Sequence, residues 1–514
     1  MMPIIKKKRM CSYSATTQSF HSFSNSRIWI FIFIVIFLPT IIFSFGGDIP
    51  VRWPNHFIIG LVNTRTEVGW MDSSGVPWDA RYCYLCGGFT GGWAQWLPNG
   101  DYARLYMEES RNSGYIPAFT YYQIPGDEGE SYSLDSTHIN DSTYMCQYFQ
   151  DYKLLLDLIA VFDSTVIIVL EPDFWGYMQQ HAREHGDTTD NPSSVFAYVD
   201  STGLPYCQGF ENSLAGIGRC LINMTRTFAP KALVGLHANL WSAAMGTDSG
   251  LVYSPDSVVI KAAEKTGIYL KRCGADSGDI VIVEKNGLDA GGWWAIYSVH
   301  CFYWGDEEMR HYVLWVNKLT DIIGKRACGW QIPIGHIELP NVDSLYEDTF
   351  AEYFFAHMVD SFPYHIKDFY NAGCIGILYG GGTVLSTNYR VDGGWFRERA
   401  YEYYTYGPYM FQPSVEEKPV SKVRSIELEI RPNPFIKSTI ISYQIQDRSI
   451  MLGAKCLIYN LSGRLMRVFP ISQPVNSITW DGKDSQGRDL PNGMYFCRLQ
   501  IKDFNQTTKV ILIK

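Results

Sequence analysis

The sequence predicts an α/β protein, in which a (β/α)8 barrel of the TIM type precedes a small all-β, immunoglobulin-like sandwich. Between residues 51 and 411, apolar strand-like runs alternate with amphipathic helical stretches. No Gly-rich nucleotide-binding turn follows the first strand, which disfavours the alternative of an open doubly wound sheet. After residue 411, short alternating strands separated by turn signals replace the helical pattern. These three observations set the fold class.

The barrel prediction rests on eight strand-like runs with helical patterns between them. The strands are expected at 57–63, 81–86, 116–124, 166–171, 232–237, 280–284, 329–334 and 375–379. Helical periodicity is expected at 101–113, 148–160, 214–228, 257–272, 306–324 and 348–369. The strands are apolar along their bodies, as strands buried on both faces of a parallel sheet should be.

Residues 1–47 resemble an export signal. A basic run at 6–9 precedes an apolar stretch at 28–45. An uncleaved membrane anchor is the alternative, because the apolar stretch is near the shortest length that spans a bilayer. Domain boundaries are therefore expected at 1–47 for the leader, 48–411 for the barrel, 412–424 for a linker and 425–514 for the sandwich.

Composition excludes some partners. The net charge of -9 leaves no basic surplus to neutralise phosphates, so no nucleic-acid partner is expected.

Of the 12 cysteines, removal of Cys11 with the leader leaves an odd number, so at least one thiol should be free or intermolecular. Cys83 and Cys86 have CxxC spacing but lie in a strand-like run without a second pair, which favours core residues over a metal or redox site.

The end of the fourth strand is the first candidate site. The apolar run 166–170 stops at Glu171, Pro172 and Asp173, followed by Phe174 and Trp175. Proline cannot continue the ladder, so the two carboxylates are expected at the carboxyl end of the strand. Substrates of TIM-type barrels bind at that end.

Polar and aromatic residues also follow the later strands. If the barrel is right, they converge at one end of it, and the expected substrate-binding residues among them are His237, Asn239, Trp241, Trp293, Trp294, Trp330, Gln331, His336 and Tyr379. The acids Glu284 and Asp289 follow the sixth strand.

This set of residues fits glycoside cleavage, which needs a protonated acid at the leaving oxygen and an ionised carboxylate as base or nucleophile. Asp173 or Glu171 is expected as proton donor, with Asp289 or Glu284 as its partner. Two alternatives stay open: Glu171 is a buried structural acid satisfied by a neighbouring strand, and Asp289 is a turn residue before Gly291.

Residues 166–173 resemble the strand and Glu-Pro-Asp motif of glycoside hydrolase family 6, the cellobiohydrolases and endoglucanases. The resemblance implies that Asp173 is the catalytic acid. Asp127-Glu128 stands where that family has Arg-Asp. The larger clan of retaining barrel glycosidases is similar at Glu171, its acid position, but Gln331 stands at strand seven where that clan has its nucleophile.

The C-terminal region begins with a Pro-containing, charged stretch at 412–423 that reads as a linker. Strands are expected at 426–430, 439–444, 455–459, 465–469, 477–480, 493–500 and 509–513. The motifs at 431–435, 458–464, 480–484 and 490–496 closely resemble the C-terminal sorting domain of type IX secretion. The resemblance implies export across an outer membrane, with the secretion machinery as partner.

The sequence thus predicts a secreted or cell-surface glycoside hydrolase, monomeric, that acts on a β-linked polysaccharide without a cofactor. No metal site is expected, because the acidic run 481–489 lacks the ligand spacing of a calcium loop. The rival is a non-catalytic cell-surface protein that binds glycan through the same aromatic rings.

Overall fold

The computed structural model describes residues 47–126, 129, 131–185, 190–243, 251–285, 298, 304–334, 350–355, 364–380, 389, 392–411, 426–445, 454–460, 464–471, 475–501 and 504–513. The predicted linker and all but the last residue of the predicted leader lie outside them. No helix in the described ranges has the length and apolarity that crossing a membrane requires.

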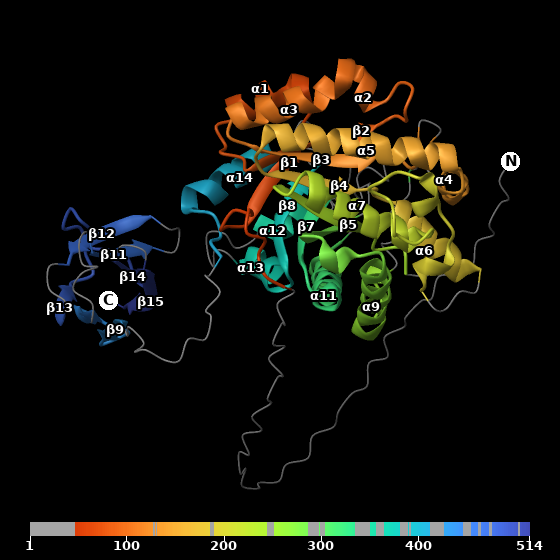
Figure 1. Cartoon of the computed structure of the whole chain (residues 1–514). Helices are drawn as coiled ribbons and strands as arrows, with labels where there is room; N and C mark the ends of the chain where they lie inside the picture. Colours follow the sequence, from red (N-terminus) through yellow and green to blue (C-terminus); the bar gives the residue numbers. More distant parts are fainter. Residues whose placement is uncertain are drawn as a thin grey trace, which may run out of the picture. The chain divides into compact units, whose positions relative to one another are not determined.

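Eight parallel strands form a closed barrel in which each strand pairs with its sequence neighbours and β1 pairs with β8 (Figure 1). The predicted fold class is therefore confirmed. The strands are β1 (Ile58–Val62), β2 (Ala80–Cys86), β3 (Ile116–Tyr122), β4 (Val166–Leu170), β5 (Ala232–Ala238), β6 (Ile280–Val283), β7 (Arg326–Ile332) and β8 (Cys374–Tyr379).

Helices surround this barrel (Figure 1). They are α1 (Val68–Ser73), α2 (Trp93–Trp96), α3 (Asp101–Asn112), α4 (Tyr132–Ile139), α5 (Ser142–Phe162), α6 (Phe174–Glu184), α7 (Leu214–Phe228), α9 (Asp256–Arg272), α11 (Asp306–Ile323), α12 (Phe350–Phe355), α13 (Tyr364–Asn371) and α14 (Trp395–Tyr406). Short 3-10 turns are η1 (Arg65–Glu67), η2 (Pro98–Gly100), η3 (Pro192–Ser194), η4 (Asp200–Thr202) and η5 (Ala275–Ser277).

The burial of the strand residues fits a closed barrel covered by helices. Every residue of β4, β5, β6 and β8 is buried, so these strands are covered on the outside by helices and on the inside by the packed barrel interior. The predicted bounds of the strands agree with the structure to within a few residues. The largest shift is at β7, which begins at Arg326 and not at residue 329.

One predicted helix begins earlier than expected, and another is described only in part. The helix expected at 148–160 begins at Ser142, because the Asp141 carboxylate accepts hydrogen bonds from the backbone N–H groups of Thr143 and Tyr144 and so caps the helix. The described part of the stretch expected as one helix at 348–369 contains α12 and all but the last two residues of α13.

The C-terminal region contains two antiparallel sheets. One has the order β13-β10-β9 and the other β12-β11-β14-β15. The strands are β9 (Ile426–Arg431), β10 (Thr439–Ile445), β11 (Lys455–Asn460), β12 (Leu465–Pro470), β13 (Val475–Trp480), β14 (Gly493–Ile501) and β15 (Phe504–Leu512). They enclose a hydrophobic core of their own, which contains Phe435, Trp480 and Tyr495. The predicted β-sandwich is confirmed.

Candidate active site

The chain after β4 takes an unusual backbone path. The strand ends at Leu170, and α6 begins at Phe174. Glu171 and Asp173 between them have φ values of 46° and 66°, which side chains other than glycine rarely adopt. The indole Nε1 of Trp175 donates a hydrogen bond of 3.0 Å to the Leu170 carbonyl and ties the first turn of α6 back to the strand end. Such strained positions cluster at functional sites.

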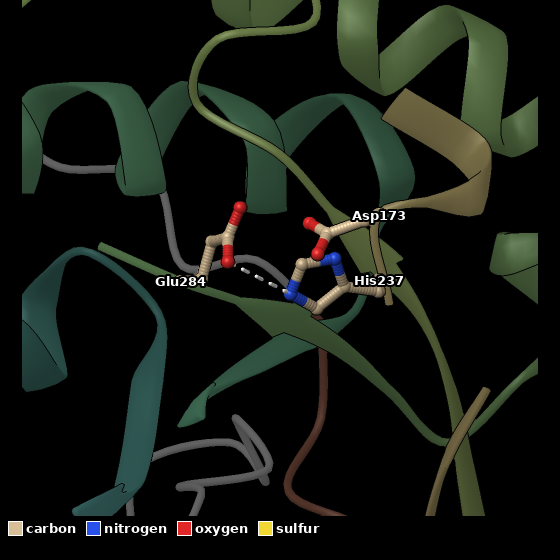
Figure 2. Close-up of side chains that lie close together, drawn as sticks. All are labelled: Asp173, His237 and Glu284. Carbon is tan, nitrogen blue, oxygen red and sulfur yellow. Dashed lines mark ion pairs between the residues drawn. The ribbon is translucent and has the colours of Figure 1, made fainter. Parts of the chain in front are cut away.

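Three side chains from successive strand ends point toward one another (Figure 2). Asp173 follows β4, His237 belongs to β5, and Glu284 follows β6. One ligand-type atom of each lies within 4.8 Å of the others. The pairing of Ala238 with Val283 fixes the level at which Glu284 emerges, because β5 and β6 are hydrogen-bonded neighbours. The structure thus brings together three of the residues predicted from the sequence.

Asn239 connects the two acids. Its Nδ2 donates hydrogen bonds of 2.8 Å to Asp173 Oδ1 and of 2.8 Å to Glu284 Oε1. Glu284 Oε1 also accepts from the indole Nε1 of Trp241 at 3.2 Å. Asn239 is 1% exposed and Glu284 7% exposed, so the bond between them is screened from water, whereas the bonds to Asp173 and Trp241 are partly buried. The two carboxylates are held in a fixed relative position.

His237 lies beside Glu284. Its Nε2 is 3.7 Å from Glu284 Oε2, and its ring meets the Trp330 ring edge-on at a centroid distance of 5.1 Å. Burial lowers the pKa of His237 to about 3, so the imidazole is neutral at ordinary pH. It therefore adds a polar group beside Glu284 without adding a charge.

Glu171 lies apart from this cluster and faces β3. Its two carboxylate oxygens accept hydrogen bonds of 3.1–3.2 Å from the backbone N–H groups of Gln123 and Ile124. The side chain is 0% exposed, and burial raises its pKa to about 8, although the two backbone donors act in the opposite direction. Glu171 is therefore placed as the alternative interpretation expected, as a buried acid whose hydrogen bonds come from a neighbouring strand.

The predicted aromatic residues have mixed surroundings. Trp330 is 1% exposed, and its Nε1 donates to Thr120 Oγ1 at 2.7 Å, so the ring fills the barrel interior. Tyr379 is 0% exposed and packs on Phe396. Trp241 is partly exposed and lies 5.1 Å from the Tyr177 ring, between centroids. Of these three predicted rings, Trp241 has a surface that a sugar could reach.

Some neighbouring residues were missed by the sequence reasoning. Gln331, which was predicted, accepts a hydrogen bond of 2.5 Å from the Tyr84 hydroxyl, and Tyr84 and Tyr122 are partly exposed rings at the ends of β2 and β3. Each tyrosine is the third residue from the end of a predicted strand, 81–86 or 116–124, which was a sequence signal for both. The predicted residues Asp289, Trp293, Trp294 and His336 lie outside the described residues.

A divalent metal ion is the other group that Asp173, His237 and Glu284 could hold, with one ligand atom from each. Asn239 disfavours this as the side chains stand, because its Nδ2 hydrogens point at both carboxylates and would face a cation placed between them. The donor set therefore suits two hydrogen-bonded carboxylates better than a metal centre.

The chain matches no known protein-family model and no curated protein. Among solved structures it is similar to an endo-beta-1,4-mannanase from Thermotoga petrophila, at 11% identity and a TM-score of 0.39 over 91% of this chain and 99% of that one. It is also similar to a Cellulomonas fimi endo-beta-1,4-mannanase double mutant, at 9% identity and a TM-score of 0.40 over 89% and 94%. A dimeric latent PorU from Porphyromonas gingivalis matches at 20% identity and a TM-score of 0.15 over 18% of this chain and 10% of PorU. Glycoside hydrolases thus occur among the structural neighbours, while the barrel assignment rests on the strand pairing described above.

Proposed function

We propose that this chain is a glycoside hydrolase that cleaves a polysaccharide with Asp173 and Glu284 as its catalytic pair. The observation that carries the proposal is the pair itself: two acids from different strand ends lie with oxygens within 4.8 Å and share the Asn239 donor. In retaining glycosidases the two carboxyl groups are about 5–5.5 Å apart, whereas inverting enzymes need a wider gap for water.

The separation favours double displacement with retention. One acid, ionised, attacks the anomeric carbon while the other, protonated, gives its proton to the leaving oxygen. The second acid, now ionised, then takes a proton from the water that attacks the anomeric carbon, which breaks the bond to the first acid and releases the product. The partly exposed Trp241 and Tyr177 rings would stack on sugar faces next to the reacting bond. Asn239 holds the two acids in place by donating to both, and the neutral imidazole of His237 lies beside Glu284.

The test begins with a screen of the purified full chain against cellulose, mannan, xylan and mixed-linkage glucan. Asp173→Asn and Glu284→Gln should each reduce turnover of the best substrate by at least about 10³-fold, because each removes one half of the pair. Asp276→Asn, at an exposed turn before β6, is the matched control and should leave turnover unchanged.

The same variants assign the two roles. With an aryl glycoside whose leaving group needs no protonation, the acid variant should retain activity and the nucleophile variant should not. Wild-type turnover in both Asp173→Asn and Glu284→Gln would contradict the proposal. Oligosaccharide binding without turnover in the wild type would instead support the glycan-binding alternative.

A metal-dependent hydrolase is the second candidate, and the neutral imidazole of His237 beside two carboxylates favours it. Chelator treatment distinguishes the metal-dependent mechanism from paired-carboxylate catalysis. Paired-carboxylate catalysis should be insensitive to EDTA, whereas a metal mechanism should lose activity and recover it on addition of Zn²⁺ or Mn²⁺.

We further propose that residues 425–514 direct export of the barrel to the cell surface through type IX secretion. The motifs at 431–435, 458–464, 480–484 and 490–496 support this. Deletion of 425–514 should leave the barrel in the periplasm of a type IX-competent host, as checked by fractionation. Surface display of the truncated chain would contradict the proposal.

A further inference from the structure

Two buried cysteines meet beside the long connection between α6 and α7. Cys207 lies in the turn before α7, and Cys220 lies within α7, 13 residues later. The Cys220 thiol points at the Cys207 sulfur at an Sγ–Sγ distance of 3.7 Å, and both residues are 0% exposed. Neither cysteine belongs to the candidate active site.

Hydrogen bonds order the connection around Cys207. Asp200 Oδ1 accepts from the backbone N–H of Gly209 at 2.7 Å, and Asn212 Oδ1 accepts from that of Val199 at 3.0 Å. Ser213 then caps α7 by accepting from the Gly216 N–H at 3.1 Å. These bonds order the backbone on both sides of Cys207 and at the start of the helix that carries Cys220.

The remaining gap is small. A disulfide requires an S–S distance of about 2.05 Å, so the sulfurs must approach by roughly 1.7 Å, which modest χ1 rotations of two cysteines can supply. A second pair, Cys456 and Cys497, has a shorter Sγ–Sγ distance of 3.3 Å. In that pair Cys456 lies opposite Leu499 and Cys497 opposite Ile458, so the cysteines are diagonal across the ladder.

Diagonal neighbours on adjacent strands have Cα atoms about 7–8 Å apart, beyond the span that a disulfide bridges without backbone movement. Cys207 and Cys220 are free of this restriction, because a turn and a helix, not two paired strands, carry them. By Sγ–Sγ distance alone, Cys456 and Cys497 would instead be the better candidates for a disulfide.

We propose that Cys207 and Cys220 form a disulfide when the chain folds outside the reducing cytoplasm. The oxidant is a protein or small-molecule disulfide. One cysteine thiolate attacks it and releases one oxidant thiol, and the second cysteine thiolate then displaces the other. The two cysteines lose two electrons and two protons, and the oxidant disulfide gains them as two thiols.

Burial also affects the timing of this step. Hydrogen bonding to Cys207, together with burial, raises the pKa of Cys220 well above that of a free thiol. The attacking thiolate is therefore scarce in the folded protein, and the bond should form during folding. Once formed, it fastens the connection that follows α6, the helix that begins directly after Asp173.

The experiment uses the full chain exported to the periplasm of a bacterial host and alkylated at lysis. Peptide mapping without reduction should recover a Cys207–Cys220 cross-linked species that is about 2 Da lighter than the two thiol forms. Cys146→Ser is the matched control. Cys146 is the further thiol close to Tyr206, and its loss should leave the cross-link in place.

A stability measurement completes the test. Reductant should lower the Tm of the wild type and leave the Tm of the Cys207→Ser, Cys220→Ser double variant unchanged. Recovery of both cysteines in alkylated form, or of a Cys146–Cys207 link, would overturn the proposal. Catalytic activity does not enter either readout, so failure of the proposed function leaves this test intact.

Discussion

Two acids separated by one proline have opposite surroundings. Glu171 is fully buried and bonded to the backbone of β3, whereas Asp173 is partly exposed and joined to Asn239. The sequence identified both as candidates but could not separate them, because which way each side chain points depends on the positive φ values after β4. A buried structural acid and the acid proposed to be catalytic thus share one motif.

The raised pKa of Glu171 predicts a pH-dependent stability. Between the ordinary value of 4.5 and the folded value of about 8, the folded state keeps a proton that the unfolded state has lost. This contribution is therefore complete at low pH and is lost as the pH rises through that window. Urea unfolding of wild type and Glu171→Gln at about pH 5 and about pH 8.5 should show the wild type losing stability relative to the variant. A pH-independent difference would contradict this.

Asn239 is the residue that joins the two acids, so its loss should affect catalysis more than binding. Asn239→Ala should lower kcat by about 10²–10³-fold with little change in KM, because the carboxylates lose a shared donor. Steady-state kinetics on the substrate found by the screen measure this. Asn223→Ala, on the exposed face of α7, is the control; an equal loss in both variants would contradict the role.

At the scale of elements, the strand ends position the site. The apolar strands and the acids that follow them were predictable, because a buried run followed by Pro or polar residues shows where each strand stops. The surroundings of Trp330 were not predictable. It is the second residue of the strand predicted at 329–334, and the pairing of β7 with its neighbours turns its ring toward His237 and Tyr82. The contacts among Asp173, Asn239 and Glu284 likewise depend on which strands are neighbours in the closed barrel. The hydrophobic periodicity of the sequence does not specify that order.

Helix α6 approaches the site so closely that a glycine is required. A Cβ at Gly176 would lie 2.5 Å from Asn239 Oδ1 and 2.7 Å from the Trp241 ring. Gly176→Ala should therefore displace Asn239, reduce kcat and cost about 1–3 kcal/mol of stability. Gly69→Ala is the control, since a Cβ at this helical position in α1 meets nothing within 4 Å. Kinetics and thermal unfolding of both variants check this, and unchanged kcat in Gly176→Ala would contradict it.

At the scale of the whole molecule, the described residues form two hydrophobic cores with separate members. The barrel core includes Trp315, and the sandwich core is centred on Trp480, which packs against Phe435 and Tyr495. The change in pattern after residue 411 predicted the β-strands that enclose the second core. Separate cores imply separate stabilities, since each region buries its own apolar surface.

Calorimetry should therefore show two unfolding transitions. Trp480→Ala should destabilise the sandwich transition by about 3–5 kcal/mol and leave the barrel transition and turnover unchanged. Trp315→Ala, in the barrel, should have the opposite pattern. A single transition that both variants shift equally would show that the two regions unfold together.

The backbone at Asp173 has φ 66° and ψ -37°, outside the regions that side-chain-bearing residues favour. Such a conformation costs about 1–3 kcal/mol. Glycine at this position would relieve that cost and remove the carboxylate, so Asp173→Gly should give a more stable chain without activity. Evolution toward stability alone would discard this acid. Its persistence would then require selection for catalysis, and lineages released from that selection should lose Asp173 early while keeping the barrel.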